Sequence, residues 1–314
     1  MKDTSVEAGP GSEESRNPAE NRGRGIALRI GAVTAFGAMM AALKYATTHG
    51  ANAVELLFYR NLFALPTILA WVAVEGGLSA IRTNRPLAHL TRSAIGLAVM
   101  FCTFQALAML PLAEATVISF SAPLFATMLS ALVLREKVLW HRWGAIALGF
   151  IGVLIVVRPG GAGLPLLGVS IGLVAALGTG VVVITLRQIG RTETAAATVF
   201  WFNIAGLAVT ALPMPYYWHG HPPYVLLALV IGGVCGGIAQ IMMTAAVRYA
   251  PVSVLAPFDY LQLVWATIWS VILFNALPTP SSLLGGCLIT AAGCYVVWRE
   301  RSQARSVVAS SSEL

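Results

Sequence analysis

Apolar residues fill most of the chain in long stretches, separated by short segments that hold most of the polar residues. Each stretch is roughly 17 to 25 residues long, the length that a helix needs to cross a hydrocarbon core of about 30 Å. Runs such as Trp143 to Val157 are apolar on every side, whereas the strands of a membrane barrel alternate apolar and polar residues. The pattern therefore predicts membrane-spanning helices, at residues 26–46, 52–74, 91–109, 113–134, 139–157, 165–187, 195–213, 224–247, 251–274 and 281–298.

The composition supports this interpretation. Of the 314 residues, 57% are hydrophobic and 11% are charged, and the mean hydropathy is +0.77. Soluble domains carry about a quarter charged residues, so a soluble globular protein is excluded. We expect an all-α polytopic membrane protein with ten transmembrane helices. Residues 1–25 are polar and lack the basic and apolar regions of a signal peptide, so they are expected to form a disordered cytoplasmic tail, and residues 302–314 a second tail.

The basic residues predict the orientation in the membrane. If the N-terminus is inside, 17 of the 20 Lys and Arg residues fall in inner segments and only Arg158 falls in an outer loop. Lys44 and Arg60 lie within predicted helices. Because Lys and Arg are retained on the cytoplasmic side, we expect both termini to be cytoplasmic, in the cytoplasmic (inner) membrane.

The two halves of the chain resemble each other. Leu-Pro-Leu-Ala-Glu-Ala at 110–115 recurs as Ala-Pro-Val-Ser-Val-Leu at 250–255, and each segment opens a predicted helix. Five helices used twice would make the second copy inverted relative to the first, since five is odd, and secondary transporters use such inverted repeats. The predicted repeats are residues 26–160 and 161–301. Similar composition of apolar helices is the alternative explanation.

Four phrases carry a resemblance to a known family. The first module is recognised in Ala115-Thr-Val-Ile-Ser-Phe-Ser-Ala-Pro-Leu-Phe125, followed by Leu132-Val-Leu-Arg-Glu136 and by Trp140 to Val153. The second is recognised in Ala256-Pro-Phe-Asp-Tyr260. These phrases resemble the EamA modules of the drug/metabolite transporter superfamily, whose members are ten-helix carriers of metabolites and drugs.

The resemblance also suggests a substrate class and has one departure. The phrase at 115–153 and Arg85-Pro-Leu-Ala-His-Leu-Thr-Arg92 are most similar to S-adenosylmethionine uptake carriers, and Ala-Pro-Phe-acidic-Tyr also resembles riboflavin importers. Family members often carry Phe-Gly-Glu near the end of the ninth helix, where this chain has Asn275 and Ala276. Glu136 keeps the acidic residue in the first module alone, so a symmetric glutamate pair is not expected here.

Ionisable residues inside the predicted helices or just at their outer ends are the first candidates for a site. A charge at the bilayer centre costs about 2.5 to 3.5 kcal/mol, so such residues are usually paired or functional. They are Lys44, Glu55, Arg60, Glu114 and Asp259. Arg60 is expected to pair with Asp259 or, alternatively, with Glu55. Asp259 is interpreted either as one half of a permanent salt bridge or as a carboxylate that binds a substrate cation or a proton.

Prolines add a second signal. Pro123 and Pro257 each remove a helical hydrogen bond and should kink the predicted helices at 113–134 and 251–274, which are the repeat-related pair. Exposed backbone at membrane depth is tolerated where it faces protein or a cavity, so these helices are expected to line a cavity, with a static kink as the alternative. The candidate substrate-binding residues are Arg60, Gln105, Ser119, Phe120, Trp201, Asp259, Tyr260 and Gln262.

The sequence thus predicts a secondary active transporter that moves a small metabolite, amino-acid-derived or nucleoside-like such as S-adenosylmethionine, by alternating access. A riboflavin-type vitamin importer and an amino acid or drug exporter are alternatives in the same family, and a channel or a membrane receptor is an alternative of another class. No enzyme motif or metal-ligand spacing is present, so no catalytic residue, cofactor or metal is expected. The expected partners are the substrate and the lipid bilayer, without nucleic acid; a homodimer is left open.

Overall fold

The computed structural model describes residues 18–133, 140–158, 164–190 and 192–311. Within these ranges the chain is helical and contains no strand. Seven helices of the described part are long and apolar enough to cross a membrane, and shorter apolar helices span Trp143–Val157 and Ala195–Ala211. The prediction of an all-α architecture is confirmed, while the count of ten crossings stays a prediction.

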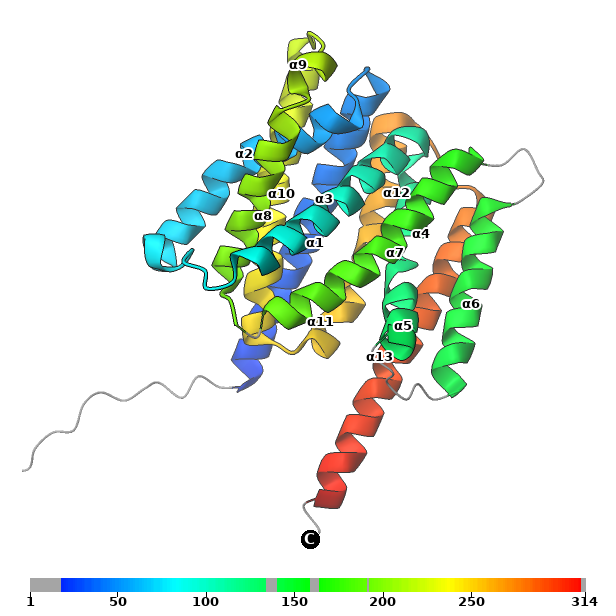
Figure 1. Cartoon of the computed structure of the whole chain (residues 1–314). Coiled ribbons are helices and arrows are strands. Elements are labelled where there is room, and N and C mark those ends of the chain that lie inside the picture. Colours follow the sequence, from blue (N-terminus) through cyan, green and yellow to red (C-terminus); the bar gives the residue numbers. More distant parts are fainter. Residues whose placement is uncertain (1–17, 134–139, 159–163, 191, 312–314) are drawn as a thin grey trace, which may run out of the picture.

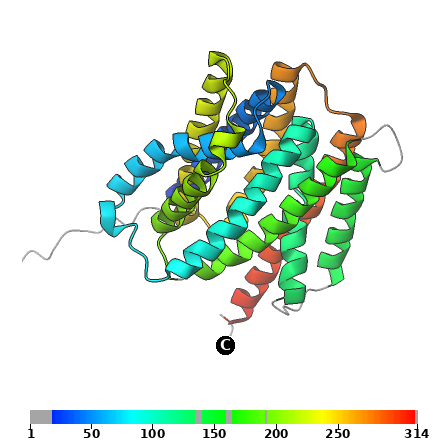
Figure 2. The same cartoon turned by 45° about the horizontal axis from the view of Figure 1, so that its top comes forward.

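The helices form one tilted bundle, and elements from both halves of the sequence lie next to one another in it (Figures 1 and 2). The first half of the chain contains α1 (Pro18–Thr48), α2 (Ala53–Val74), the 3-10 turn η1 (Gly77–Ser79), α3 (Pro86–Met109), α4 (Leu112–Ser119), α5 (Ala122–Val133) and α6 (Trp140–Val157). The second half contains α7 (Leu166–Ile189), α8 (Ala195–Ala211), α9 (Met214–Tyr217), α10 (Pro223–Tyr249), α11 (Val252–Asp259), α12 (Leu261–Phe274) and α13 (Pro280–Ser311).

The first and last helices extend beyond their predicted limits. Helix α1 begins at Pro18 instead of residue 26, and α13 continues to Ser311. The predicted tail residues 1–17 lie outside the described residues. The beginning of α1 and the end of α13 lie on the same side of the bundle, and the short α9 lies on the opposite side (Figure 1).

The helices of the two halves pack against each other in pairs. Helix α1 packs on α10, α3 on α7, α2 on α8 and α10, and α6 on α13. Glycines allow the closest approaches: Gly285 of α13 meets the backbone of Gly152 in α6 with no room for a side chain, and Gly233 and Gly237 of α10 meet the backbone of α2. Small residues at such contacts are how membrane helices pack without a hydrophobic driving force between them.

Two helices that the sequence pattern predicts as continuous are each divided in the middle. The segment 113–134 becomes α4 and α5, separated at Phe120 and Ser121, and the segment 251–274 becomes α11 and α12, separated at Tyr260. Pro123 lies in the first turn of α5, where its missing N–H costs least, and Pro257 lies inside α11, near its end. The proline signal therefore marked two helix breaks.

Candidate functional site

The two helix breaks meet at the interface between the halves of the chain. The rings of Phe120 and Tyr260 are stacked, with centroids 5.2 Å apart and planes inclined by 28°. Helix α4 packs on α12, and both α4 and α11 contact α13. The Tyr260 side chain ends against Gly293 of α13, where a larger residue would collide with its hydroxyl group. The breaks therefore place two aromatic rings, one from each half, in direct contact.

Asp259 precedes this break and forms a bidentate ion pair with Arg29 of α1. Arg29 Nε donates to Oδ1 over 2.5 Å, and Nη2 donates to Oδ2 over 2.6 Å. The Arg29 side chain is 8% exposed and the Asp259 side chain 33% exposed, so the carboxylate remains accessible while its partner is buried. Charge-assisted bidentate pairs of this kind are among the stronger hydrogen-bonded contacts in proteins.

The predicted partners of Asp259 and Arg60 are wrong. Asp259 pairs with Arg29, and Arg60 contacts neither Asp259 nor Glu55. Arg60 instead donates to the side-chain oxygen of its neighbour Asn61 over 2.9 Å, inside the bundle. Arg29 was assigned to the cytoplasmic end because the predicted helix began only three residues before it. The earlier start of α1 places Arg29 in the fourth turn of the helix, which packs on α11.

Glu55 is also fully engaged. Asn52 and Glu55 form a capping box at the start of α2, in which the Asn52 side chain accepts from the Glu55 backbone and the Glu55 carboxylate accepts from the Asn52 backbone. The other carboxylate oxygen accepts from the His219 backbone N–H over 3.0 Å and contacts His221 Nε2 over 2.9 Å. Glu55 thus fixes the loop before α10, which explains its complete burial.

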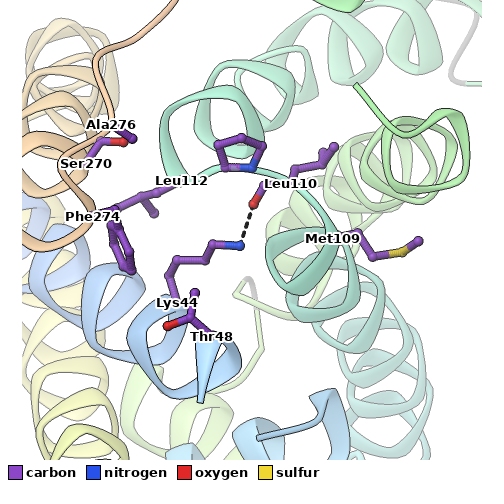
Figure 3. Close-up of a pocket in the computed structure, with 9 residues that line it drawn as sticks. Lys44, Thr48, Met109, Leu110, Leu112, Ser270, Phe274 and Ala276 are labelled. Carbon is purple, nitrogen blue, oxygen red and sulfur yellow. Dashed lines mark hydrogen bonds between the residues drawn. The ribbon is translucent and has the colours of Figure 1, made fainter. Parts of the chain in front are cut away.

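Lys44 borders a cavity of about 320 Å³ at the end of α1. This end of α1 lies on the same side of the bundle as α9 (Figure 1). Its ammonium group donates to the backbone carbonyls of Leu107 and Leu110 over 2.8 and 2.7 Å. Figure 3 shows the side chain reaching across to Leu110, with Ser270, Phe274 and Ala276 of the α12 region on another wall. These carbonyls belong to the C-terminal end of α3, where helix geometry leaves them without an internal donor.

Glu114 has a fixed partner nearby in α13. Its Oε1 accepts from the Ser282 hydroxyl over 2.8 Å, and Ser282 is in turn bonded to Thr279. Both Glu114 and Ser282 are buried. Of the five ionisable residues predicted inside helices, Lys44, Glu55 and Glu114 therefore serve local hydrogen-bond networks.

The other predicted site residues are distributed over the bundle. Ser119 is exposed, and its hydroxyl donates to the Ala115 carbonyl; Gln105 and Gln262 are half-buried on α3 and α12. Trp201 lies on the surface of α8, and its indole N–H donates to the Ile81 carbonyl over 2.9 Å. The structure brings together Phe120 and Tyr260, with Asp259 adjacent in the chain, and it does not bring Arg60 or Trp201 to that point. Glu136 lies outside the described residues.

Another buried acid–base pair, Glu193 with His89, holds loops on the side of the bundle where α1 begins and α13 ends. Glu193, before α8, contacts His89 Nε2 of α3 over 3.2 Å, and the Asn84 backbone N–H donates to the same carboxylate. Burial raises the pKa of Glu193, but the hydrogen bonds from His89, Thr83 and Asn84 and the charge of His89 together lower it below the ordinary value of 4.5. The carboxylate is thus held in its charged form.

Two basic residues of interest were missed because both were counted as topology signals. Arg29 is the partner of Asp259, and Arg92 lies buried in α3. The predicted helix began at residue 91, so Arg92 was expected at its end; the structure begins α3 at Pro86 and makes Arg92 its seventh residue, a depth at which a cation needs compensation.

Comparisons with known proteins agree on one family. A model of the EamA-like transporter family matches residues 23–158 and again residues 166–299. An S-adenosylmethionine uptake transporter of Rickettsia bellii is 28% identical over 251 residues, which cover 80% of this chain and 85% of that protein. A pseudopaline exporter, CntI, of Pseudomonas aeruginosa is 26% identical over 283 residues, covering 88% and 96%.

Two further similarities extend over most of the chain. A riboflavin transporter of Brucella anthropi is 27% identical over 290 residues, covering 88% of this chain and 99% of the relative. A solved crystal structure matches with a TM-score of 0.65 at 19% identity, over 89% of this chain and 98% of that chain. At this identity the structural similarity supports the fold alone.

Proposed function

The chain belongs to the EamA-like transporter family, and we propose that it is a secondary active carrier that moves an amino-acid-derived or nucleoside-like metabolite, such as S-adenosylmethionine, across the cytoplasmic membrane by alternating access. Family membership makes it a membrane transporter, not an enzyme. The observation that carries the proposal is the meeting of the two broken helices at Phe120 and Tyr260. Broken helices at a repeat interface are where secondary transporters bind their substrates.

The positions of the breaks support an inverted repeat. Helices α4 and α11 each contain eight residues, each follows a proline, Pro111 or Pro251, and each ends directly before the aromatic residue of the stacked pair. The offset between corresponding positions is 140 residues throughout, the same offset that relates the sequence phrases. Two independent kinks in unrelated helices would not be expected to share length, flanking residue and register.

The packing pairs support the same symmetry. If α7 repeats α1 and α10 repeats α3, the contact of α1 with α10 corresponds to the contact of α7 with α3, and both are observed. The contacts of α2 with α8 and of α6 with α13 then pair each helix with its own repeat copy. This arrangement supports ten crossings in two inverted five-helix repeats, with α4 and α5 counted as one crossing and α11 and α12 as another.

The orientation follows from the charge distribution and the positions of the chain ends. The start of α1 and the end of α13 lie on one side of the bundle, as an even number of crossings requires (Figure 1). We assign this side to the cytoplasm because most basic residues lie there. The cavity beside Lys44 then faces outward, and the Arg29–Asp259 pair lies about 22 Å further along α1 toward the cytoplasm.

This placement suggests how transport works. Between the cavity and the ion pair, Gly37 of α1 packs tightly on Trp265 of α12, which closes the path. A substrate that arrives from the outer cavity would reach Phe120 and Tyr260, whose rings suit a flat purine. Its positive charge would then compete with Arg29 for Asp259. Release of Arg29 would separate α1 from α11 and open the cytoplasmic side.

A transport assay tests the proposal. Purified protein in liposomes should take up one member of a panel containing S-adenosylmethionine, riboflavin and aromatic amino acids, with saturation and with counterflow against internal unlabelled substrate. Counterflow is expected because a carrier returns loaded more readily than empty. Linear flux without exchange would indicate a channel, and absence of flux for every compound would reject this substrate class.

The same panel decides between the family alternatives. Pseudopaline export and riboflavin transport are the activities named for two relatives, and the stacked rings would also suit a flavin. Preferential uptake of riboflavin would replace the metabolite assignment while the carrier mechanism stands. Assays in right-side-out and inside-out vesicles would give the direction.

The topology has a separate test. After replacement of Cys102, Cys235, Cys287 and Cys294, single cysteines at Gly220 and Ser310 should be labelled from opposite faces of the membrane by an impermeant maleimide. Labelling of both from the same face would reject the even number of crossings and the inverted repeat.

A further inference from the structure

Two arginines lie buried inside the bundle without a carboxylate partner. Arg60 of α2 is 2% exposed and Arg92 of α3 is 7% exposed. Among the residues that the structure describes, neither forms an ion pair, and Arg60 Nε, Arg92 Nε and Arg92 Nη1 have no hydrogen-bond acceptor. Guanidinium groups stay charged in proteins, so these are two buried positive charges without compensation.

Both guanidinium groups lie against the same aromatic ring. The Arg92 guanidinium carbon lies 4.0 Å from the centroid of the Phe202 ring in α8, and that of Arg60 lies 5.9 Å from the same centroid. Two amide side chains complete the cluster: Asn61 accepts from Arg60, and Asn203 donates to Asn61 over 3.4 Å while its own oxygen has no donor. The cluster therefore contains donors from α2 and α3 gathered around one face of α8.

Two other arginines of the described part, Arg29 and Arg248, have carboxylate partners. Arg29 is matched by Asp259, and Arg248 is matched by Glu75 over 2.7 Å although it is far more exposed. An aromatic ring attracts a cation only weakly compared with the cost of removing a guanidinium group from water, and two like charges at one ring also repel each other. The Phe202 ring alone does not account for the burial of both arginines.

We propose that Arg60 and Arg92 form a binding site for a carboxylate group, supplied either by the transported molecule or by a separate small anion. The planar guanidinium fork matches the two oxygens of a carboxylate and forms two parallel hydrogen bonds with it. The unpaired nitrogens supply the donors, and one negative charge relieves the repulsion between two positive ones. Binding of the carboxylate of the transported molecule rests on the proposed function, whereas binding of a separate small anion does not.

The small residues around the cluster offer a way to disturb it without changing its charge. A Cβ atom at Gly96 would lie 2.6 Å from Arg92 Nη1 and 2.9 Å from the Phe202 ring. Gly96→Ala should therefore displace the Arg92 fork while both positive charges remain. This variant complements removal of the charge by Arg60→Gln or Arg92→Gln.

Thermal unfolding of the purified full-length protein in detergent tests the site without transport. Sodium acetate, compared with sodium chloride at equal ionic strength, should raise the unfolding midpoint of the wild type saturably. The apparent affinity for acetate should fall about ten- to a hundredfold in Arg60→Gln, Arg92→Gln and Gly96→Ala, the range expected for loss of a charged hydrogen bond. The control Arg248→Gln should respond like the wild type. No saturable acetate effect, or an equal effect in all variants, overturns the proposal.

A second arm identifies the source of the carboxylate. S-adenosylmethionine and its decarboxylated analogue are compared for stabilisation of the wild type and of Arg92→Gln. Stabilisation that requires both the carboxylate and Arg92 assigns the site to the transported molecule; acetate binding with no discrimination between the two compounds assigns it to a separate anion. Acetate binding in a protein that transports none of the panel would retain this site while rejecting the proposed function.

Discussion

The Arg29–Asp259 pair and the Arg60–Arg92 cluster are two charged regions of one bundle with opposite electrostatic states. In the first, a buried arginine meets a half-buried carboxylate in a bidentate contact. In the second, two buried arginines share one aromatic ring and have no carboxylate. A paired carboxylate that remains exposed can exchange its partner for another cation, whereas an unpaired cationic cluster can only gain from an anion. This difference is why we propose that the two regions recognise opposite charges.

Loss of the carboxylate should give the largest effect. Asp259→Asn should insert and fold but reduce uptake at least about tenfold, because Arg29 and the substrate cation both lose the negative charge that they bind. Arg29→Gln should retain substrate binding while lowering turnover, since Asp259 then lacks the competing cation that closes the structure. Initial uptake rates over a range of substrate concentrations, normalised to reconstituted protein, measure both.

Glu75→Gln is the matched control for Asp259→Asn, because it also removes the acid of an arginine pair, on the exposed rim of the bundle. It should leave uptake within about twofold of the wild type, as exposed pairs contribute little. Unchanged uptake per molecule in Asp259→Asn would make the carboxylate structural.

The stacked rings should give an intermediate effect. Phe120→Ala and Tyr260→Ala should each raise the KM for a substrate with a purine or flavin ring roughly five- to a hundredfold, the range for loss of one base–aromatic stack. Tyr260→Phe keeps the ring and should change KM little. If the KM for a ring-free amino acid rises equally, the stack supports the helix breaks and does not contact substrate.

A smaller effect, on stability, is expected when a carboxylate is introduced by mutation beside the Arg60–Arg92 cluster. Asn203→Asp would place a carboxylate beside Asn61, which already accepts from Arg60. The internal negative charge should raise the unfolding midpoint on the order of 3 °C and abolish the response to acetate. A lower midpoint with an intact acetate response would mean that the arginines do not need an anion.

The smallest change in stability should come from loss of the His89–Glu193 pair. In this pair an acid and a base already contact each other, so it serves as the reference for the two regions compared above. The pKa of Glu193 is lowered in the folded protein, so its contribution is complete above pH 4.5 and is lost as the pH falls through the folded-state pKa. The wild type should therefore exceed Glu193→Gln in unfolding midpoint at pH 7 by less than the shift expected for Asn203→Asp, and this difference should shrink below pH 4.5. A constant difference across pH 3.5 to 7 would contradict this linkage.

The sequence predicted the helices well because the hydrocarbon core of the membrane imposes the same structural requirements on every membrane-spanning segment. Each span must satisfy its own backbone and present apolar side chains, so length and hydropathy suffice to find it. The prolines at 123 and 257 likewise indicated where two helices fail, since their effect on the backbone is local. Among the candidate site residues, Phe120 and Tyr260, which stack on each other, and the adjacent Asp259 were accessible by the same local reasoning.

Partner choice was decided only by the tertiary structure. The pairing of Asp259 with Arg29 joins residues 230 positions apart, and it depends on where α1 begins and on which face it turns toward α11. The isolation of Arg60 and Arg92 depends on the approach of α2, α3 and α8 around Phe202. The attraction between two charges depends on their distance in space and not on their separation in the sequence. The sequence by itself therefore determined which charges in the membrane had to be compensated, and helix packing determined which of them found a partner.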